Sequence, residues 1–200
     1  MESPSTTGKE DAARRQLGTA LALFIDDLDP VSVQCLACGG GEIAETLVKV
    51  GGGSPFSEHA LSSMPDLTPG ELGRLRNQYW NAFKHSTARN GKPRDDQAIL
   101  DSFDDSKNDH ALFIGWLDLG EALKKMPIEA QVFQVWYYSL YPEKLDPNFD
   151  SEEFQKLFPR LKEIPRNAQK ALLRKVIKRS RANSAVMTDS RTDRRKLIMK

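Results

Sequence analysis

Apolar residues recur at spacings of three and four along most of the chain, which is the pattern of helices that bury one face. In the first such run Ala13, Leu17, Leu21 and Phe24 share a face, so the sequence predicts a helix over about residues 13–28. No stretch alternates apolar and polar residues for long enough to predict a sheet. The pattern therefore predicts an all-α fold, a bundle of four to five main helices.

The second expected helix has clear end signals. Asp29 is well placed as an N-cap, with Pro30 at the first helical position. The helix should run to about Val50, where the glycine run 51–53 stops it.

A third helix is expected after a loop that has at most one short turn near His59. Thr68 and Glu71 have the spacing of a capping box, and this helix should run to about Thr87. The remaining helices are expected around residues 99–103, over 106–125, from Pro127 through an aromatic-rich segment to about 140, over 151–159, and from Pro165 onward.

These signals divide the chain into four parts. We expect a disordered N-terminus (1–12), a helical bundle domain (13–145), a helical C-terminal extension (146–181) and a disordered basic tail (182–200). No internal repeat at solenoid spacing is present in the sequence.

The chain has 200 residues, of which 39% are hydrophobic and 28% charged. This composition is that of a soluble globular domain and is too apolar for wholesale disorder. No apolar run approaches the roughly 18 residues of a membrane span, and the first ten residues lack the basic start and apolar core of a secretory signal. We therefore expect a cytosolic protein without a membrane partner.

The net charge of +1 conceals a strong asymmetry. Residues 160–200 carry 14 Lys and Arg against three acidic residues, a net charge of +11, whereas the preceding 159 residues carry −10. A basic block of this kind indicates nucleic acid, an anionic membrane surface or an acidic protein as a partner, and of these we expect RNA or an acidic protein. The alternative is a solvent-exposed basic tail that packs against the acidic part of the same chain.

The middle of the second helix contains Cys35, Cys38 and the run Gly39-Gly40-Gly41. Two cysteines cannot complete a four-cysteine metal site, so we interpret them as core residues, with a regulatory disulfide as the alternative. The glycines follow no strand and lack the Lys-Ser/Thr of a phosphate loop, which makes close helix packing or a kink the favoured interpretation.

The third helix carries the most informative polar residues. Asn77, Asn81 and His85 are four positions apart and share one face, while Arg76 and Lys84 lie on the neighbouring ridge with Trp80. Such a face can bind phosphate or a base edge, or supply a general acid or base. A ladder of structural hydrogen bonds between helices is the alternative.

Two segments resemble a group of uncharacterised bacterial proteins related to the HEPN superfamily. Residues 29–43 are similar to that group's small-residue helix, and Asn81-Ala82-Phe83-Lys84-His85 is similar to its Asn-Ala-hydrophobic-Lys-His segment. The resemblance spans about residues 13–140. It implies a compact helical bundle, often dimeric and often a metal-independent ribonuclease, with His85 at the family histidine and Asn81 at the polar position.

One position departs from that family's pattern. Trp80 stands where the family arginine precedes the polar residue, and the nearest arginine, Arg76, lies more than one helical turn earlier. Long helical side chains lean toward the N-terminus, so Arg76 is expected to point away from His85.

An acidic run forms a third candidate site, at residues Asp95, Asp96, Asp101, Asp104, Asp105, Asp109, His110 and Asp118. Carboxylates and imidazole bind divalent metals, but the spacing matches no known metal loop. Helix capping and solubility explain most of these acids, so we expect no metal and no cofactor.

The extension completes the set of candidate binding residues, which are Lys170, Arg174, Lys175, Lys178, Arg179 and Arg181, beside Asn77 and Lys84 of the third helix. The first hypothesis is a non-catalytic HEPN-like module that self-associates as a homodimer and engages RNA or a protein partner through these residues. The second is a metal-independent ribonuclease that uses His85 with Asn81 and Arg76. Whether the protein is an enzyme stays open at this point.

Overall fold

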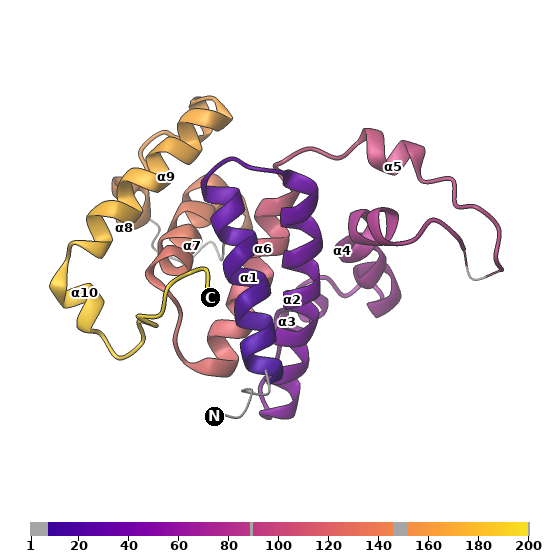
Figure 1. The fold of residues 1–200 in the computed structure, drawn as a ribbon, viewed down its shortest axis with the longest axis horizontal. Coiled ribbons are helices and arrows are strands. Elements are labelled where there is room, and N and C mark those ends of the chain that lie inside the picture. Colours follow the sequence, from indigo (N-terminus) through magenta and orange to yellow (C-terminus); the bar gives the residue numbers. More distant parts are fainter. Residues whose placement is uncertain (1–7, 89, 146–151, 200) are drawn as a thin grey trace, which may run out of the picture.

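The computed structural model describes residues 8–88, 90–145 and 152–199 (Figure 1). Within those ranges it contains ten α-helices and two short 3-10 turns, Pro142–Lys144 and Leu161–Glu163. The helices are α1 (Lys9–Ile25), α2 (Pro30–Val50), α3 (Phe56–Ser63), α4 (Pro69–Lys84), α5 (Gln97–Asp101), α6 (Lys107–Leu123), α7 (Ile128–Leu140), α8 (Glu152–Leu157), α9 (Arg166–Arg181) and α10 (Ser184–Thr188). Only two isolated bridges adopt β pairing in the described part. The prediction of an all-α fold is confirmed.

Helix α2 begins and ends at the predicted residues. The Asp29 carboxylate accepts hydrogen bonds from the backbone N–H groups of Val31 and Ser32, at 3.3 and 3.0 Å, and Pro30 is the first helical residue. Helix α1 differs from its prediction because it begins at Lys9 and ends at Ile25. Asp27 adopts a left-handed conformation with φ of 58°, which ends the helical path three residues earlier than the apolar pattern indicated.

Helices α1, α2 and α6 pack closely around Leu17. A Cβ added at Gly40 would lie 2.8 Å from Leu17 Cγ, and one added at Gly115 would lie 2.6 Å from Leu17 Cδ2. Real side chains do not approach so closely, so a larger residue at either crossing would force Leu17 to shift. The interpretation of the glycine run as a close-packing feature holds for Gly40.

Helix α7 provides the aromatic centre of the core. Phe133 and Trp136 are completely buried, and both rings lie against Phe24 of α1, at centroid distances of 5.4 and 5.8 Å. Edge-to-face contacts of this kind add to the free energy gained from burying the rings. The aromatic-rich segment expected after Pro127 therefore lies at the centre of the core.

Helices α4 and α5 lie on the opposite side of α2 from α1 and α9 (Figure 1). The capping box of α4 is present, with Thr68 Oγ1 accepting from the Glu71 backbone and Glu71 accepting from the Thr68 backbone. The helix ends at Lys84, three residues before the predicted end, and His85 is extended. The preceding loop contains an eight-residue helix, α3, where at most one short turn was expected.

The C-terminal segment corrects the prediction of disorder after residue 181. Residues 184–188 form α10, and Leu197 belongs to the hydrophobic core with an exposed fraction of 7%. The backbone of Met126 pairs with that of Arg191 and Asp193, at 2.9 and 2.8 Å. At the other end, residues 9–12 of the expected disordered N-terminus are helical, and residues 1–7 lie outside the described part.

None of the helices described is both long enough and apolar enough to cross a lipid bilayer.

Candidate functional site

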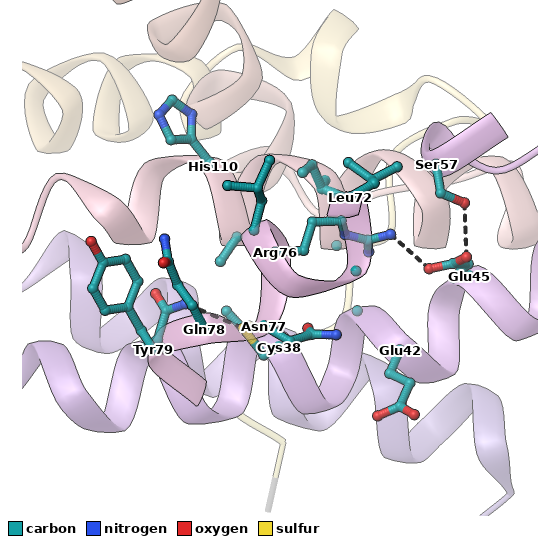
Figure 2. A pocket seen from close by; sticks show the side chains of 18 of the residues that line it. Cys38, Glu42, Glu45, Ser57, Leu72, Arg76, Asn77, Gln78, Tyr79 and His110 are labelled. Atoms are coloured by element: carbon teal, nitrogen blue, oxygen red, sulfur yellow. Dashed lines mark hydrogen bonds and ion pairs between the residues drawn. The ribbon is translucent and has the colours of Figure 1, made fainter. Parts of the chain in front are cut away.

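The polar residues of α4 do not converge into one site. Arg76 Nη1 donates to Glu45 Oε2 at 2.8 Å and so points to α2 (Figure 2). His85 lies beyond the last turn, exposed, and its backbone N–H donates to the Asn81 carbonyl. Arg76 and His85 are nine positions apart, which is a rise of about 13 Å along a helix axis. The geometry therefore does not place His85, Asn81 and Arg76 around one phosphate.

The other members of that face are also separated. Asn77 lines a cavity between α4 and α2, whereas Asn81 lines a shallower groove beside Arg94. Lys84 Nζ lies 3.7 Å from the centre of the Trp80 ring, a cation–π contact that holds the ammonium group against its own helix.

Glu45 joins three helices. It accepts hydrogen bonds from Arg76 of α4 and Ser57 Oγ of α3, each at 2.8 Å (Figure 2). Lys49 Nζ of its own helix donates a third, also at 2.8 Å. Burial alone would raise the pKa of Glu45, but the bonds from Lys49 and Ser57 and the charge of Arg76 lower it to about 2. Glu45 is therefore a carboxylate at all ordinary pH values, and it attaches α3 and α4 to the bundle.

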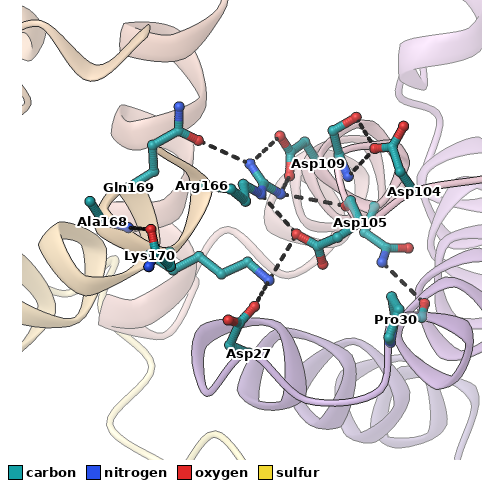
Figure 3. Close-up of polar contacts among 12 residues, drawn as sticks. Asp27, Pro30, Asp104, Asp105, Asp109, Arg166, Ala168, Gln169 and Lys170 are labelled. Carbon is teal, nitrogen blue, oxygen red and sulfur yellow. Dashed lines mark hydrogen bonds and ion pairs between the residues drawn. The ribbon is translucent and has the colours of Figure 1, made fainter. Parts of the chain in front are cut away.

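Lys170, the first of the basic residues predicted to bind RNA, is completely buried in the structure. Its Nζ lies 2.7 Å from Asp27 Oδ1 and 2.8 Å from Asp105 Oδ2 (Figure 3). A buried ammonium group with two carboxylate partners holds α9 to the bundle and is not available to phosphate. The prediction of a nucleic-acid contact at Lys170 is therefore wrong.

Arg166 reinforces the same attachment. It donates to Asp105 at 2.8 Å and to both oxygens of Asp109 (Figure 3). Tyr141 Oη also donates to Asp109, at 2.8 Å. Asp109 is completely buried, so these donors compensate the loss of its hydration. Two of the acids proposed as metal ligands, Asp105 and Asp109, are thus used for docking α9.

The rest of the acidic run is dispersed. Asp118 Oδ1 accepts from the Phe56 backbone at 2.8 Å, and His110 Nδ1 is 2.8 Å from Tyr137 Oη. Burial, with Lys144 and Lys107 nearby, lowers the pKa of His110 to about 4. Across the described ranges, no group of three or more His, Cys, Asp or Glu residues is arranged to hold a metal ion.

The two cysteines are free thiols on one side of α2. Burial raises the pKa of Cys38 to about 12, and Gln34 Nε2 donates to its sulfur at 3.2 Å. A thiol with so high a pKa is a poor nucleophile, so Cys38 acts as a small packing residue.

The remaining basic residues of α9 fall into two groups. Arg174 Nη1 donates to the Ile25 carbonyl at 2.5 Å and Arg181 pairs with Glu129, so both are partly engaged. Lys175, Lys178 and Arg179 are exposed, and their side chains contact no acidic residue in the part of the chain that is described. These three cations remain available to a partner.

The C-terminal segment adds further cations beside α9. A groove of about 820 Å³ runs between α9 and residues 193–198. Its lining contains six basic residues, Arg174, Lys178, Arg181, Arg194, Arg195 and Lys196, against three acidic ones, Asp26, Glu129 and Asp193. Arg195 is neutralised by Asp193 at 2.8 Å, whereas Arg194 and Lys196 have no acidic partner among the residues described. Sequence reasoning missed this juxtaposition because it assigned residues 194–196 to a disordered tail, although their charge run was visible.

No family model, no curated protein and no solved structure matches this chain.

Proposed function

We propose that the protein is a non-catalytic module that binds the phosphate backbone of RNA. The contact surface, here called the basic surface, consists of five exposed cations. Lys178, Arg194 and Lys196 line the groove, and Lys175 and Arg179 are exposed on α9 beside it. The observation that carries the proposal is that these five cations lack acidic partners within the described residues, while the other cations of α9 hold the fold together.

The composition of the groove favours a polyanion over a protein partner. Its lining contains no aromatic residue, so bases cannot stack there and the contact is made to the backbone. A protein partner draws affinity from apolar surface that becomes buried. The apolar floor residues Ile128, Ile177 and Leu197 are only 5%, 5% and 7% exposed, and the exposed apolar surface of the groove lies mainly on Ile198, which is 52% exposed.

The resemblance of the α4 segment to HEPN proteins makes RNA the nucleic acid to test first. The separation of Arg76 from His85 supports binding without cleavage, because phosphate cleavage needs a cation and an acid or base at one phosphate. The exposed ring of His85 keeps the ribonuclease as the second candidate.

The experiment measures fluorescence anisotropy of a labelled 20-nucleotide single-stranded RNA with the full chain in EDTA. A variant with Lys175→Gln, Lys178→Gln and Arg179→Gln should lose at least ten-fold in affinity. A control with Lys92→Gln, Lys124→Gln and Lys125→Gln, which changes three exposed lysines elsewhere, should lose little. Equal losses would refute the proposed surface.

The same mixtures, run on a denaturing gel, test the second candidate. Intact RNA after overnight incubation is the expected result. Cleavage that disappears in a folded His85→Ala variant would establish the ribonuclease instead.

A further inference from the structure

A second concave site lies on the other side of the bundle from the basic surface. An open cavity of about 720 Å³ is lined by residues of α2, α3, α4 and α6 (Figure 2). This volume is in the range of small-molecule sites, which commonly combine an apolar lining with a few polar groups.

Arg76 is the cation of this cavity, and most of its donors are unused. Only Nη1 is engaged, by Glu45, so Nε and Nη2 have no partner among the described residues. The Arg76 side chain is 20% exposed, which leaves it accessible from the cavity. The free Nε–Nη2 edge of a guanidinium group matches the two oxygens of a carboxylate, in a planar, bidentate arrangement.

Three amide side chains of the lining have unused hydrogen-bonding groups. Gln34 is only 2% exposed, and its Oε1 is buried without a partner in the described structure. Asn77 and Gln78 also make no side-chain hydrogen bond within the residues described, and Figure 2 shows Asn77 in the space between α4 and α2. An unpartnered buried oxygen is energetically costly, and a ligand N–H group would satisfy it.

The charge balance of the lining selects the class of anion. The cations Lys49, Arg76 and Lys107 are matched by Glu42, Glu45 and Glu58. A lining with no net charge disfavours a polyphosphate and suits a ligand with little or no net charge, such as a zwitterion whose carboxylate reaches Arg76. The apolar lining residues Leu61, Leu72 and Ile114 add room for an aliphatic side chain.

We propose that this cavity binds the carboxyl end of an apolar amino acid, free or at the end of a short peptide. The carboxylate pairs with the free edge of Arg76, the neighbouring N–H is accepted by a lining amide, and the aliphatic side chain lies against the leucines. This binding is independent of the proposed RNA contact, because none of its residues belongs to the basic surface.

The test is isothermal titration of the full chain with four probes: the tripeptide Gly-Ala-Leu, its C-terminal amide, free leucine and inorganic phosphate. The expected result is a Kd below 1 mM for the tripeptide and at least ten-fold weaker binding of the amide. Leucine binding as tightly as the tripeptide identifies a free amino acid as the ligand. No binding of tripeptide or leucine, equal binding of acid and amide, or tighter binding of phosphate overturns the proposal.

Variants assign the contact to Arg76. Arg76→Gln should weaken tripeptide binding roughly 10- to 100-fold, the effect of one charge-assisted pair, and Arg74→Gln, on the exposed side of the same helix, should leave it unchanged. Because Arg76 also supports α4, Asn77→Asp is the second variant. The Asn77→Asp variant retains the ion pair between Arg76 and Glu45. It also places a negative charge beside the ligand carboxylate, so it should weaken tripeptide binding. Unchanged binding in a folded Asn77→Asp variant would contradict the assignment.

Discussion

Arg14 and Asp193 lie 179 positions apart in the sequence, and their side chains meet in the interior. Arg14 Nε donates to Asp193 Oδ2 at 3.0 Å, with the two side chains 1% and 4% exposed. The same guanidinium donates to the carbonyl oxygens of Leu197 and Lys196, at 3.1 and 3.2 Å. The last residues of the chain are therefore part of the core and carry their cations in fixed positions.

Loss of the Arg14 guanidinium should cost much stability. Arg14→Met leaves Asp193 buried with Arg195 as its remaining charged partner, so the free energy of unfolding should fall by about 3 kcal/mol. Arg15→Met is the matched control. Arg15 is 41% exposed in a one-turn pair with Asp11, and its loss should cost less than about 1 kcal/mol. Urea denaturation measures the free energy of unfolding of both variants. Equal decreases in the two would contradict a structural role for the buried Arg14–Asp193 pair.

Gly18 should control docking of the C-terminal segment. A Cβ at this position would lie 2.2 Å from the carbonyl oxygen of Leu197, which belongs to backbone and cannot easily move aside. Gly18→Ala should therefore release residues 193–199, seen as faster amide hydrogen exchange there. Gly73→Ala, in α4 with open space around the added Cβ, is the control and should slightly stabilise the protein. Unchanged exchange in Gly18→Ala would count against the docked segment.

His110 should make the protein less stable in mild acid. Its pKa is lowered to about 4, below the usual value near 6.5, so the unfolded chain takes up a proton that the folded chain resists. The free energy of unfolding that the neutral His110 ring contributes is fully present above about pH 6.5 and is lost as the pH falls toward 4. Thermal unfolding between pH 7 and 5 should show a steeper fall in Tm for the wild type than for His110→Gln. Parallel curves for the two proteins would exclude this role.

Two lysines of α9 should separate stability from RNA binding. Lys170→Met removes a buried partner of Asp27 and Asp105 and should destabilise the fold by roughly 3 kcal/mol. Lys175→Met changes an exposed cation and should leave stability within about 0.5 kcal/mol. Lys175→Met should weaken RNA binding, whereas the folded fraction of Lys170→Met should bind RNA with little change in affinity. An RNA affinity that depends on Lys170 and not on Lys175 would place the contact elsewhere.

Local signals predicted the helices well. The Asp29 cap, Pro30 and the Thr68–Glu71 capping box act within a few residues, so their consequences can be inferred from the sequence. The early ends of α1 and α4 were missed because turn conformations such as that of Asp27 leave little trace in an apolar pattern.

Long-range partners explain what was missed in the candidate site. Lys170 and Lys175 have similar surroundings in the sequence, and only the positions of Asp27 and Asp105 distinguish a buried cation from an exposed one. The docked C-terminus depends in the same way on Arg14 and Gly18. Asn77 and Asn81 do share a face of α4, but different neighbours place them in different cavities.

The salt dependence of RNA affinity tests the central claim most directly. Each phosphate contact to a single strand contributes about −0.7 to the slope of log association constant against log salt concentration, so the five cations of the basic surface predict a slope of about −3.5. In the variant with Lys175→Gln, Lys178→Gln and Arg179→Gln, the magnitude of this slope should be smaller by about 2. A slope near zero, or one that the variant leaves unchanged, would contradict backbone binding at this surface.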